Sequence, residues 1–145
     1  MLNLTGRYAL DRERSESLYP HMRALGCEEI AALASEKLNI TLDIVHTAST
    51  LTIWQSSQLG DTKRVLQTGG TTAETPSRAA KVSCDDRALV IETVFPKGRI
   101  VDRRTLQDDV MAQTLELTVK GSDQAIRTRR YFRRTGPPDA SVTPA

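Results

Sequence analysis

Arginine is concentrated near the C-terminal end of the sequence, where its side chains could bind an anion. The chain has 15 arginines and 5 lysines, and five of the arginines lie within Arg127–Arg134. A guanidinium group keeps its charge when it is removed from water, and it offers a planar fork of donors to carboxylates and phosphates. In an extended strand, one face of this segment carries Arg127, Arg129, Tyr131 and Arg133, and the other carries Thr128, Arg130, Phe132 and Arg134.

One arginine-bearing face must therefore point inward if this strand belongs to a closed sheet. A buried guanidinium without a partner is costly, so it requires an internal anion, ordered water or a bound acidic ligand to offset the lost hydration. The chemistry that this arrangement predicts is capture of an acidic ligand.

Most of the chain has the pattern of short antiparallel strands, which would position these arginines. From Asn39 onward, apolar and polar residues alternate, as in Ile40–Val45 and Gln113–Val119. Turn residues recur at roughly ten-residue intervals, which leaves no room for the crossover helices of a parallel sheet. The helical segment is Ser15–Lys37, where apolar residues recur at spacings of three and four on both sides of Gly26. The pattern predicts an all-β fold with a lid of two short helices.

The composition predicts one folded domain and argues against several functions. The chain has 145 residues, with 39% hydrophobic and 26% charged residues. It contains no apolar run of membrane-spanning length and no secretory signal at its start, so we expect a cytoplasmic protein without stable membrane insertion. Cys27, Cys84, His21 and His46 are scattered, so neither a metal site nor a cofactor is expected. Motifs for nucleotide binding or a catalytic nucleophile are absent, and a net charge of +2 is small for a nucleic-acid partner.

Several short motifs follow one another along residues 4–134. They are Gly6-Arg7-Tyr8-Ala9-Leu10, Met22-Arg23-Ala24-Leu25-Gly26, Leu51-Thr52-Ile53, Leu89-Val90-Ile91 and Arg129-Arg130-Tyr131. Together with one strand, two helices and a long meander, they resemble the intracellular fatty-acid-binding protein family, which comprises cytosolic lipid and retinoid carriers of the calycin group. The resemblance implies a ten-stranded up-and-down antiparallel β-barrel over residues 1–134, capped by a helix-turn-helix. Residues 135–145, with three prolines and no hydrophobic period, are expected to form a flexible tail.

The resemblance also implies a ligand-binding site inside the barrel. Arg129-Arg130-Tyr131 is similar to the family's Arg-x-Tyr, and Arg104 falls where the family places its first headgroup arginine. The expected ligand-binding residues are Arg104, Arg127, Arg129 and Tyr131 for the acid group, Leu42, Ile53 and Ile91 for the hydrophobic tail, and Leu59 at the portal.

Two features leave the register of this site open. The interval from Arg104 to Arg129 is longer than in the family, which implies a lengthened hairpin near Gln107–Val110 or Lys120–Gln124. A slip of one residue would exchange Arg103 for Arg104 on the inner face. Asp102 would share a face with Arg104, and an internal ion pair would then neutralise that arginine.

The sequence thus supports two hypotheses of different kinds. The first is a non-enzymatic intracellular lipid-binding protein that holds a long-chain fatty acid or a similar hydrophobic carboxylate inside the barrel. The second is a structural or adaptor barrel that docks on a larger assembly, for example a cytoskeletal one, through its surface and its basic C-terminal strand.

Overall fold

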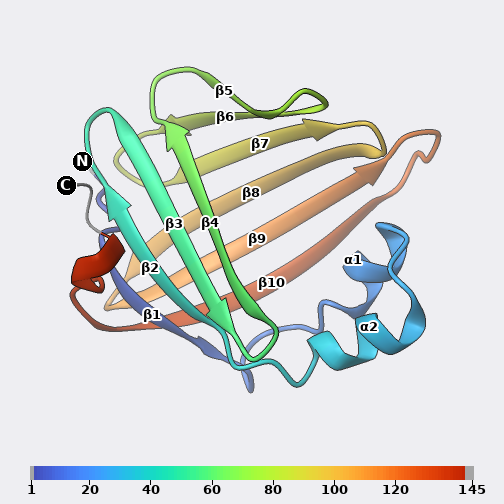
Figure 1. Ribbon diagram of the computed structural model, residues 1–145, viewed down its shortest axis with the longest axis horizontal. Coiled ribbons are helices and arrows are strands. Elements are labelled where there is room, and N and C mark those ends of the chain that lie inside the picture. Colours follow the sequence, from blue (N-terminus) through green and yellow to red (C-terminus); the bar gives the residue numbers. More distant parts are fainter. Residues whose placement is uncertain (1, 143–145) are drawn as a thin grey trace.

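Ten strands form one antiparallel sheet that curves into a nearly closed barrel (Figure 1). The computed structural model describes residues 2–142. The strands are β1 (Gly6–Asp11), β2 (Thr41–His46), β3 (Thr50–Ser57), β4 (Gly60–Gln67), β5 (Thr71–Thr75), β6 (Arg78–Cys84), β7 (Leu89–Phe95), β8 (Gly98–Gln107), β9 (Val110–Val119) and β10 (Ala125–Gly136). Their order in the sheet is β4-β3-β2-β1-β10-β9-β8-β7-β6-β5, so β1 and β10 join the two halves of the meander. The predicted up-and-down barrel is confirmed.

The β8–β9 connection is a two-residue hairpin turn. Asp108 and Asp109 adopt left-handed φ angles of 50° and 62°, a conformation that Asp tolerates because its short side chain can hydrogen-bond locally. Of the two places where the sequence predicts extra length, Gln107–Val110 contains this two-residue turn, and Lys120–Gln124 forms the longer loop between β9 and β10. That loop fixes the register of β10 against β9.

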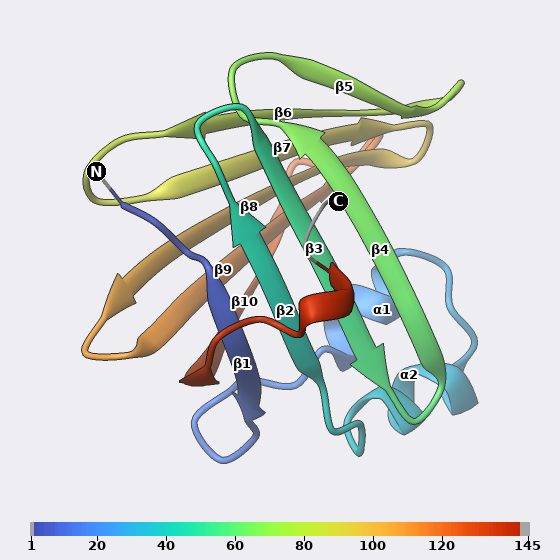
Figure 2. The same cartoon turned by 60° about the vertical axis from the view of Figure 1, so that its left-hand side comes forward.

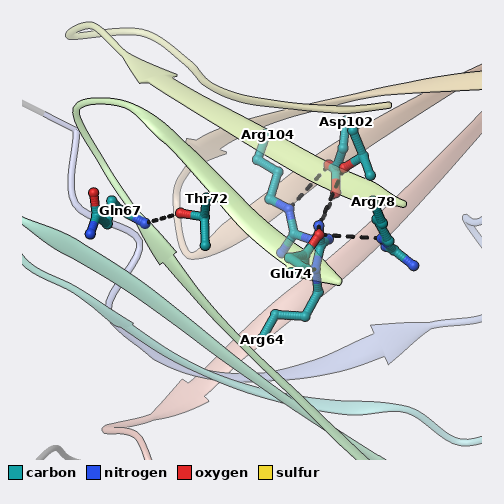
Figure 3. Close-up of polar contacts among 8 residues, drawn as sticks. Arg64, Gln67, Thr72, Glu74, Arg78, Asp102 and Arg104 are labelled. Atoms are coloured by element: carbon teal, nitrogen blue, oxygen red, sulfur yellow. Dashed lines mark hydrogen bonds and ion pairs between the residues drawn. The ribbon is translucent and has the colours of Figure 1, made fainter. Parts of the chain in front are cut away.

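The barrel is incomplete as a hydrogen-bonded sheet between β4 and β5, the two ends of the strand order. Side chains connect this gap (Figure 3). Arg64 donates to both carboxylate oxygens of Glu74, at 2.7 and 2.9 Å, and Arg78 pairs with the same carboxylate at 3.2 Å. The backbone N–H of Gln67 donates to Thr72 Oγ1 at 2.9 Å. A bidentate arginine–carboxylate contact has a defined geometry, so it holds the two strands in register without a ladder.

Two short helices, α1 (Tyr19–Ala24) and α2 (Glu29–Ser35), lie at one end of the barrel (Figures 1 and 2). Pro20 occupies the first turn of α1, where its missing N–H costs least. Gly26 follows α1 with a φ of +92°, which reverses the chain between the helices. No helix among residues 2–142 is long and apolar enough to span a membrane.

Hydrogen bonds fasten this lid to two strand connections. Lys97, in the turn between β7 and β8, donates through Nζ to the carbonyl oxygen of Leu25 at 3.0 Å. Gln58, in the turn between β3 and β4, accepts from the backbone N–H of Asn39 at 2.8 Å and donates to the carbonyl oxygen of Lys37 at 3.4 Å. The lid therefore contacts both halves of the barrel mouth.

Buried apolar side chains form one cluster inside the barrel. Its fully buried large members include Leu4, Tyr8, Ile44, Leu51, Leu66, Leu89, Ile91, Met111 and Phe132. Burial of such side chains contributes about 1.5–3 kcal/mol each, so this cluster is the main source of the barrel's stability.

The C-terminal part of the described residues packs on the outside of the barrel. Strand β10 continues to Gly136, and a 3-10 turn, η1 (Ala140–Val142), lies over the outer face of β2 (Figure 2). Val142 is buried, and the backbone N–H of Asp139 donates to Asp43 Oδ1 at 3.1 Å. Residues 143–145 of the predicted tail lie outside the described residues.

Candidate functional site

The inner face of β10 carries Thr128, Arg130 and Phe132, which are all buried, whereas Arg129 is exposed and Tyr131 is half-buried. The prediction that Arg127, Arg129 and Tyr131 point into the barrel is therefore wrong by one residue. The pairing with β9 sets this register, because the buried Met111 and Gln113 lie opposite Phe132 and Arg130.

The outward residues of β10 have structural partners of their own. The backbone N–H of Tyr131 donates to Ser15 Oγ at 2.8 Å, and the Arg14 guanidinium lies 4.4 Å from the centroid of the Tyr131 ring. The backbone N–H of Arg129 donates to Glu16 Oε1 at 2.6 Å. These contacts hold the linker between β1 and α1 along the edge of β10.

Arg104, not Arg103, occupies the inner face of β8. Arg104 is 5% exposed, whereas Arg103 is exposed to solvent. Arg104 donates to Asp102 through Nε at 3.1 Å and through Nη2 at 3.0 Å (Figure 3). The predicted internal ion pair is present, because residues i and i+2 of a strand share a face.

Arg104, Gln113 and Arg130 form one row across three adjacent strands. Gln113 lies opposite Arg104 of β8 on one side and opposite Arg130 of β10 on the other. Directly opposed residues have Cβ atoms roughly 5 Å apart, so the three side chains meet inside the barrel. Gln113 also donates through Nε2 to Asp102 Oδ2 at 3.1 Å. One carboxylate thus accompanies two guanidinium groups, and the buried row has one positive charge in excess.

Burial lowers the pKa of Arg130 to about 10, and the positive charge of Arg104 acts in the same direction. Arg130 still remains protonated near neutral pH. Its guanidinium lies 5.1 Å from the centroid of the Phe132 ring, a cation–π contact that positions it without neutralising it.

His21 of α1 extends this cluster toward the lid. It is 6% exposed, and burial lowers its pKa below the ordinary value of 6.5. The charge of Arg130 lowers the same pKa further, whereas Asp102 opposes the shift. A neutral imidazole therefore lies within the electrostatic reach of Arg130, and it can donate or accept one hydrogen bond at each nitrogen.

Four buried side-chain atoms lack a hydrogen-bond partner within residues 2–142, and all belong to this cluster. They are His21 Nδ1, Arg104 Nη1, Gln113 Oε1 and Arg130 Nη2. Buried polar groups in folded proteins are nearly always paired, and each unsatisfied one costs about 1–3 kcal/mol. Their convergence distinguishes this cluster from an ordinary buried ion pair.

A cavity of about 490 Å³ lies beside the linker between β1 and α1 and reaches Arg130. Its wall is formed by the linker, by the end of α2 and by Leu10 of β1, and Leu18 contributes a second apolar side chain. This volume lies within the range of small-molecule sites.

The predicted tail-contact residues and the predicted portal residue have different environments. Leu42, Ile53 and Ile91 all belong to the buried apolar cluster. Leu59 lies in the turn between β3 and β4 and is 75% exposed, so it is not part of the inner wall.

Sequence reasoning missed Arg130, Gln113 and His21 as site residues. Gln113 carried a readable signal, because it is the polar member of the inward series Met111, Gln113 and Leu115 on β9. His21 carried little, since a single histidine on a short helix has no characteristic spacing.

The arrangement is suited to holding an anion. The cluster combines excess positive charge, burial of its side chains and several unused donors. No group of three or more His, Cys, Asp or Glu side chains suited to holding a metal ion occurs in the part of the chain that the structure describes.

No family model and no curated protein sequence matches the chain. Solved structures do. The Echinococcus granulosus fatty-acid-binding protein 1 superposes with a TM-score of 0.76 at 12% identity, covering 92% of this chain and 98% of that one. The apo Caenorhabditis elegans lipid binding protein 8 superposes with a TM-score of 0.76 at 20% identity, covering 90% of this chain and 94% of that one. The Schistosoma mansoni fatty acid binding protein in complex with arachidonic acid superposes with a TM-score of 0.73 at 18% identity, covering 91% of this chain and 96% of that one. The chain has the fold of the fatty-acid-binding proteins, as its motifs predict.

Proposed function

We propose that the protein is a non-enzymatic cytoplasmic carrier that binds a hydrophobic carboxylate, such as a long-chain fatty acid, inside the barrel. The observation that carries this proposal is the buried row of Arg104, Gln113 and Arg130 with its unpartnered donors. A carboxylate would neutralise the excess charge and accept hydrogen bonds from Arg130 Nη2 and Arg104 Nη1.

Arg130 is the principal anchor in this proposal. Arg104 is already paired with Asp102, so its charge is largely compensated. Arg130 has no carboxylate partner among the described residues, and its neighbour on the inner face, Phe132, provides no hydroxyl group. The aliphatic tail would lie against apolar inner residues such as Leu42, Ile53 and Ile91.

Proteins of the same fold support this proposal. The Schistosoma mansoni structure contains arachidonic acid, and other proteins with this fold are described as fatty acid transporters or lipid binding proteins. Ligand entry would pass the lid, where Leu59 and the exposed Ile30 and Leu33 of α2 offer apolar side chains.

The test is a matched pair of variants measured by isothermal titration calorimetry with hexadecanoate. Arg130→Gln removes a buried charge-assisted contact, so we expect a loss of about 1.5–3 kcal/mol, or roughly ten- to hundredfold in affinity. Arg129→Gln removes the same charge from the outer face and should change affinity less than about twofold, because exposed charges contribute little.

Two controls complete this test. Hexadecanol, which has the same tail without the charge, should bind equally well to the unmodified protein and to Arg130→Gln. Equal losses from both variants, or no binding of hexadecanoate by the unmodified protein, would refute the carrier proposal.

A second candidate function is docking through the outer face of β10. It is favoured by the exposed guanidinium groups of Arg127, Arg129 and Arg133, which form a basic strip beside the lid linker. Glu116 and Asp11 neutralise two of them in part. Co-sedimentation with polyglutamate would test this function, which predicts binding that Arg129→Gln weakens and that Arg130→Gln leaves unchanged.

A further inference from the structure

The orientation of the Gln113 amide is determined by its contact with Asp102. Gln113 is 5% exposed, and its Nε2 lies 3.1 Å from Asp102 Oδ2. An ionised carboxylate only accepts hydrogen bonds, so the atom facing it must be the amide nitrogen. The amide oxygen, Oε1, therefore points to another side of the cluster, where it has no partner among the described residues.

The unpartnered atoms require both a hydrogen-bond acceptor and a hydrogen-bond donor. Arg104 Nη1 and Arg130 Nη2 are donors and need an acceptor, whereas Gln113 Oε1 is an acceptor and needs a donor. An ionised carboxylate supplies acceptors only. A simple fatty acid would thus satisfy the arginines and leave the Gln113 oxygen buried without a hydrogen bond.

We infer that the ligand of this barrel carries a hydroxyl group close to its carboxylate, and that Gln113 recognises this hydroxyl. The inference rests on the proposed carboxylate site and specifies its ligand class as a hydroxylated hydrophobic acid. Gln113 lies between the two arginines in the cross-strand row, so its oxygen is beside the position that the carboxylate would take. A hydroxyl on the second or third carbon of an acid lies next to its carboxylate, so it would lie close to the Gln113 oxygen when the carboxylate contacts the arginines.

Neutral His21 is compatible with the same ligand. It is buried at the lid side of the cluster, and its unpartnered Nδ1 can donate to a carboxylate oxygen or accept from a hydroxyl, depending on its tautomer. The described side chains leave the Gln113 oxygen unpaired, so a hydroxyl of the ligand can supply its donor.

The first experiment compares three acids with the unmodified protein by calorimetry. These are hexadecanoate, 3-hydroxyhexadecanoate and 3-methoxyhexadecanoate. We expect the hydroxy acid to bind roughly tenfold more tightly than hexadecanoate, because a site with a buried hydrogen-bonding group discriminates against ligands that leave that group unpaired. The methoxy acid keeps the oxygen but has no donor, so it should bind no better than hexadecanoate. This comparison requires no variant and is independent of any folding defect.

The second experiment assigns the discrimination to Gln113. Gln113→Met removes the amide oxygen that would receive the ligand hydroxyl, so in this variant the hydroxy acid should bind no more tightly than hexadecanoate. Gln107→Met, at the exposed end of β8, is the matched control and should preserve the roughly tenfold preference.

The outcomes separate this inference from the function on which it rests. If none of the acids binds, the carrier proposal itself fails. If hexadecanoate binds as tightly as the hydroxy acid and still depends on Arg130, the carrier proposal stands and the inference about the hydroxyl is overturned. A preference that survives in Gln113→Met would equally overturn the assignment to Gln113.

Discussion

The inside and the outside of the barrel contain the same arginine–carboxylate contact in two different surroundings. Inside, Arg104 Nη2 lies 3.0 Å from Asp102 Oδ2, and both side chains are less than 10% exposed. Outside, Arg127 Nε lies 3.0 Å from Glu116 Oε2, but the arginine side chain is 70% exposed. Equal distances do not imply equal energies, because water screens the outer pair and competes for its hydrogen bonds.

Arg130 differs from both of these arginines. It is buried like Arg104, yet it has no carboxylate partner within residues 2–142, and burial lowers its pKa to about 10. The folded barrel therefore maintains a charge that it does not compensate. Positions of this kind are frequently functional, because the cost in stability is offset when a ligand binds.

The largest effect is expected from breaking the inner ion pair. Arg104→Met leaves Asp102 buried without its charged partner, which should lower the free energy of unfolding by about 3–5 kcal/mol in urea denaturation. The double variant Arg104→Met/Asp102→Leu removes both charges and should recover most of this loss. A double variant as unstable as the single one would show that packing, rather than an unpaired charge, determines the effect.

Removing the unpaired charge of Arg130 should raise, rather than lower, the free energy of unfolding. A pKa of about 10 in the folded protein, well below the ordinary value of the free side chain, means that the protonated form is disfavoured by folding. Both the folded and the unfolded state are protonated below about pH 10, so the full cost applies at neutral pH and is lost only as the pH rises beyond the folded-state pKa. At about 1.36 kcal/mol per pKa unit, Arg130→Met should raise the free energy of unfolding by up to about 3 kcal/mol.

The matched control for this variant is on the outer face of the same strand. Arg129→Met removes an exposed charge and should change stability by less than about 0.5 kcal/mol. Thermal melts of the ligand-free proteins would compare the two. If Arg130→Met melts at a lower temperature than the unmodified protein, the contact of Arg130 with Phe132 contributes more than its desolvation costs.

The contrast between these faces also explains which features the sequence predicts. Alternation and regular turns are properties of each strand, so they predicted the antiparallel strands correctly, and the three- and four-residue spacing in Ser15–Lys37 predicted the helical lid. The closed barrel was predicted by the family resemblance. On β10, however, each face carries arginines and one aromatic ring, Tyr131 or Phe132, so alternation alone cannot say which face is inside.

The residues of the neighbouring strand β9 show which face of the sheet is inside. On β9, the apolar Met111, Leu115 and Leu117 alternate with polar residues and identify an inner face. The five-residue loop between β9 and β10 prevented this face from being carried over to β10 by counting residues. The sequence also left open whether Arg103 or Arg104 faces inward, and the structure places Arg104 inside, where it pairs with Asp102 on the same face of β8.

The smallest effect is expected from the outer pair, and it provides the sharpest comparison. Arg127→Gln should reduce the free energy of unfolding by less than about 0.5 kcal/mol, because an exposed ion pair gains little over two hydrated side chains. A double-mutant cycle with Glu116→Gln isolates the coupling between the two charges. This coupling should vanish at about 1 M salt, where the screening length falls to roughly 3 Å, whereas the coupling between Arg104 and Asp102 should persist because ions do not reach the interior. Similar coupling energies for the two pairs would show that burial does not distinguish the inner arginines, and would remove the energetic basis for a ligand site at Arg130.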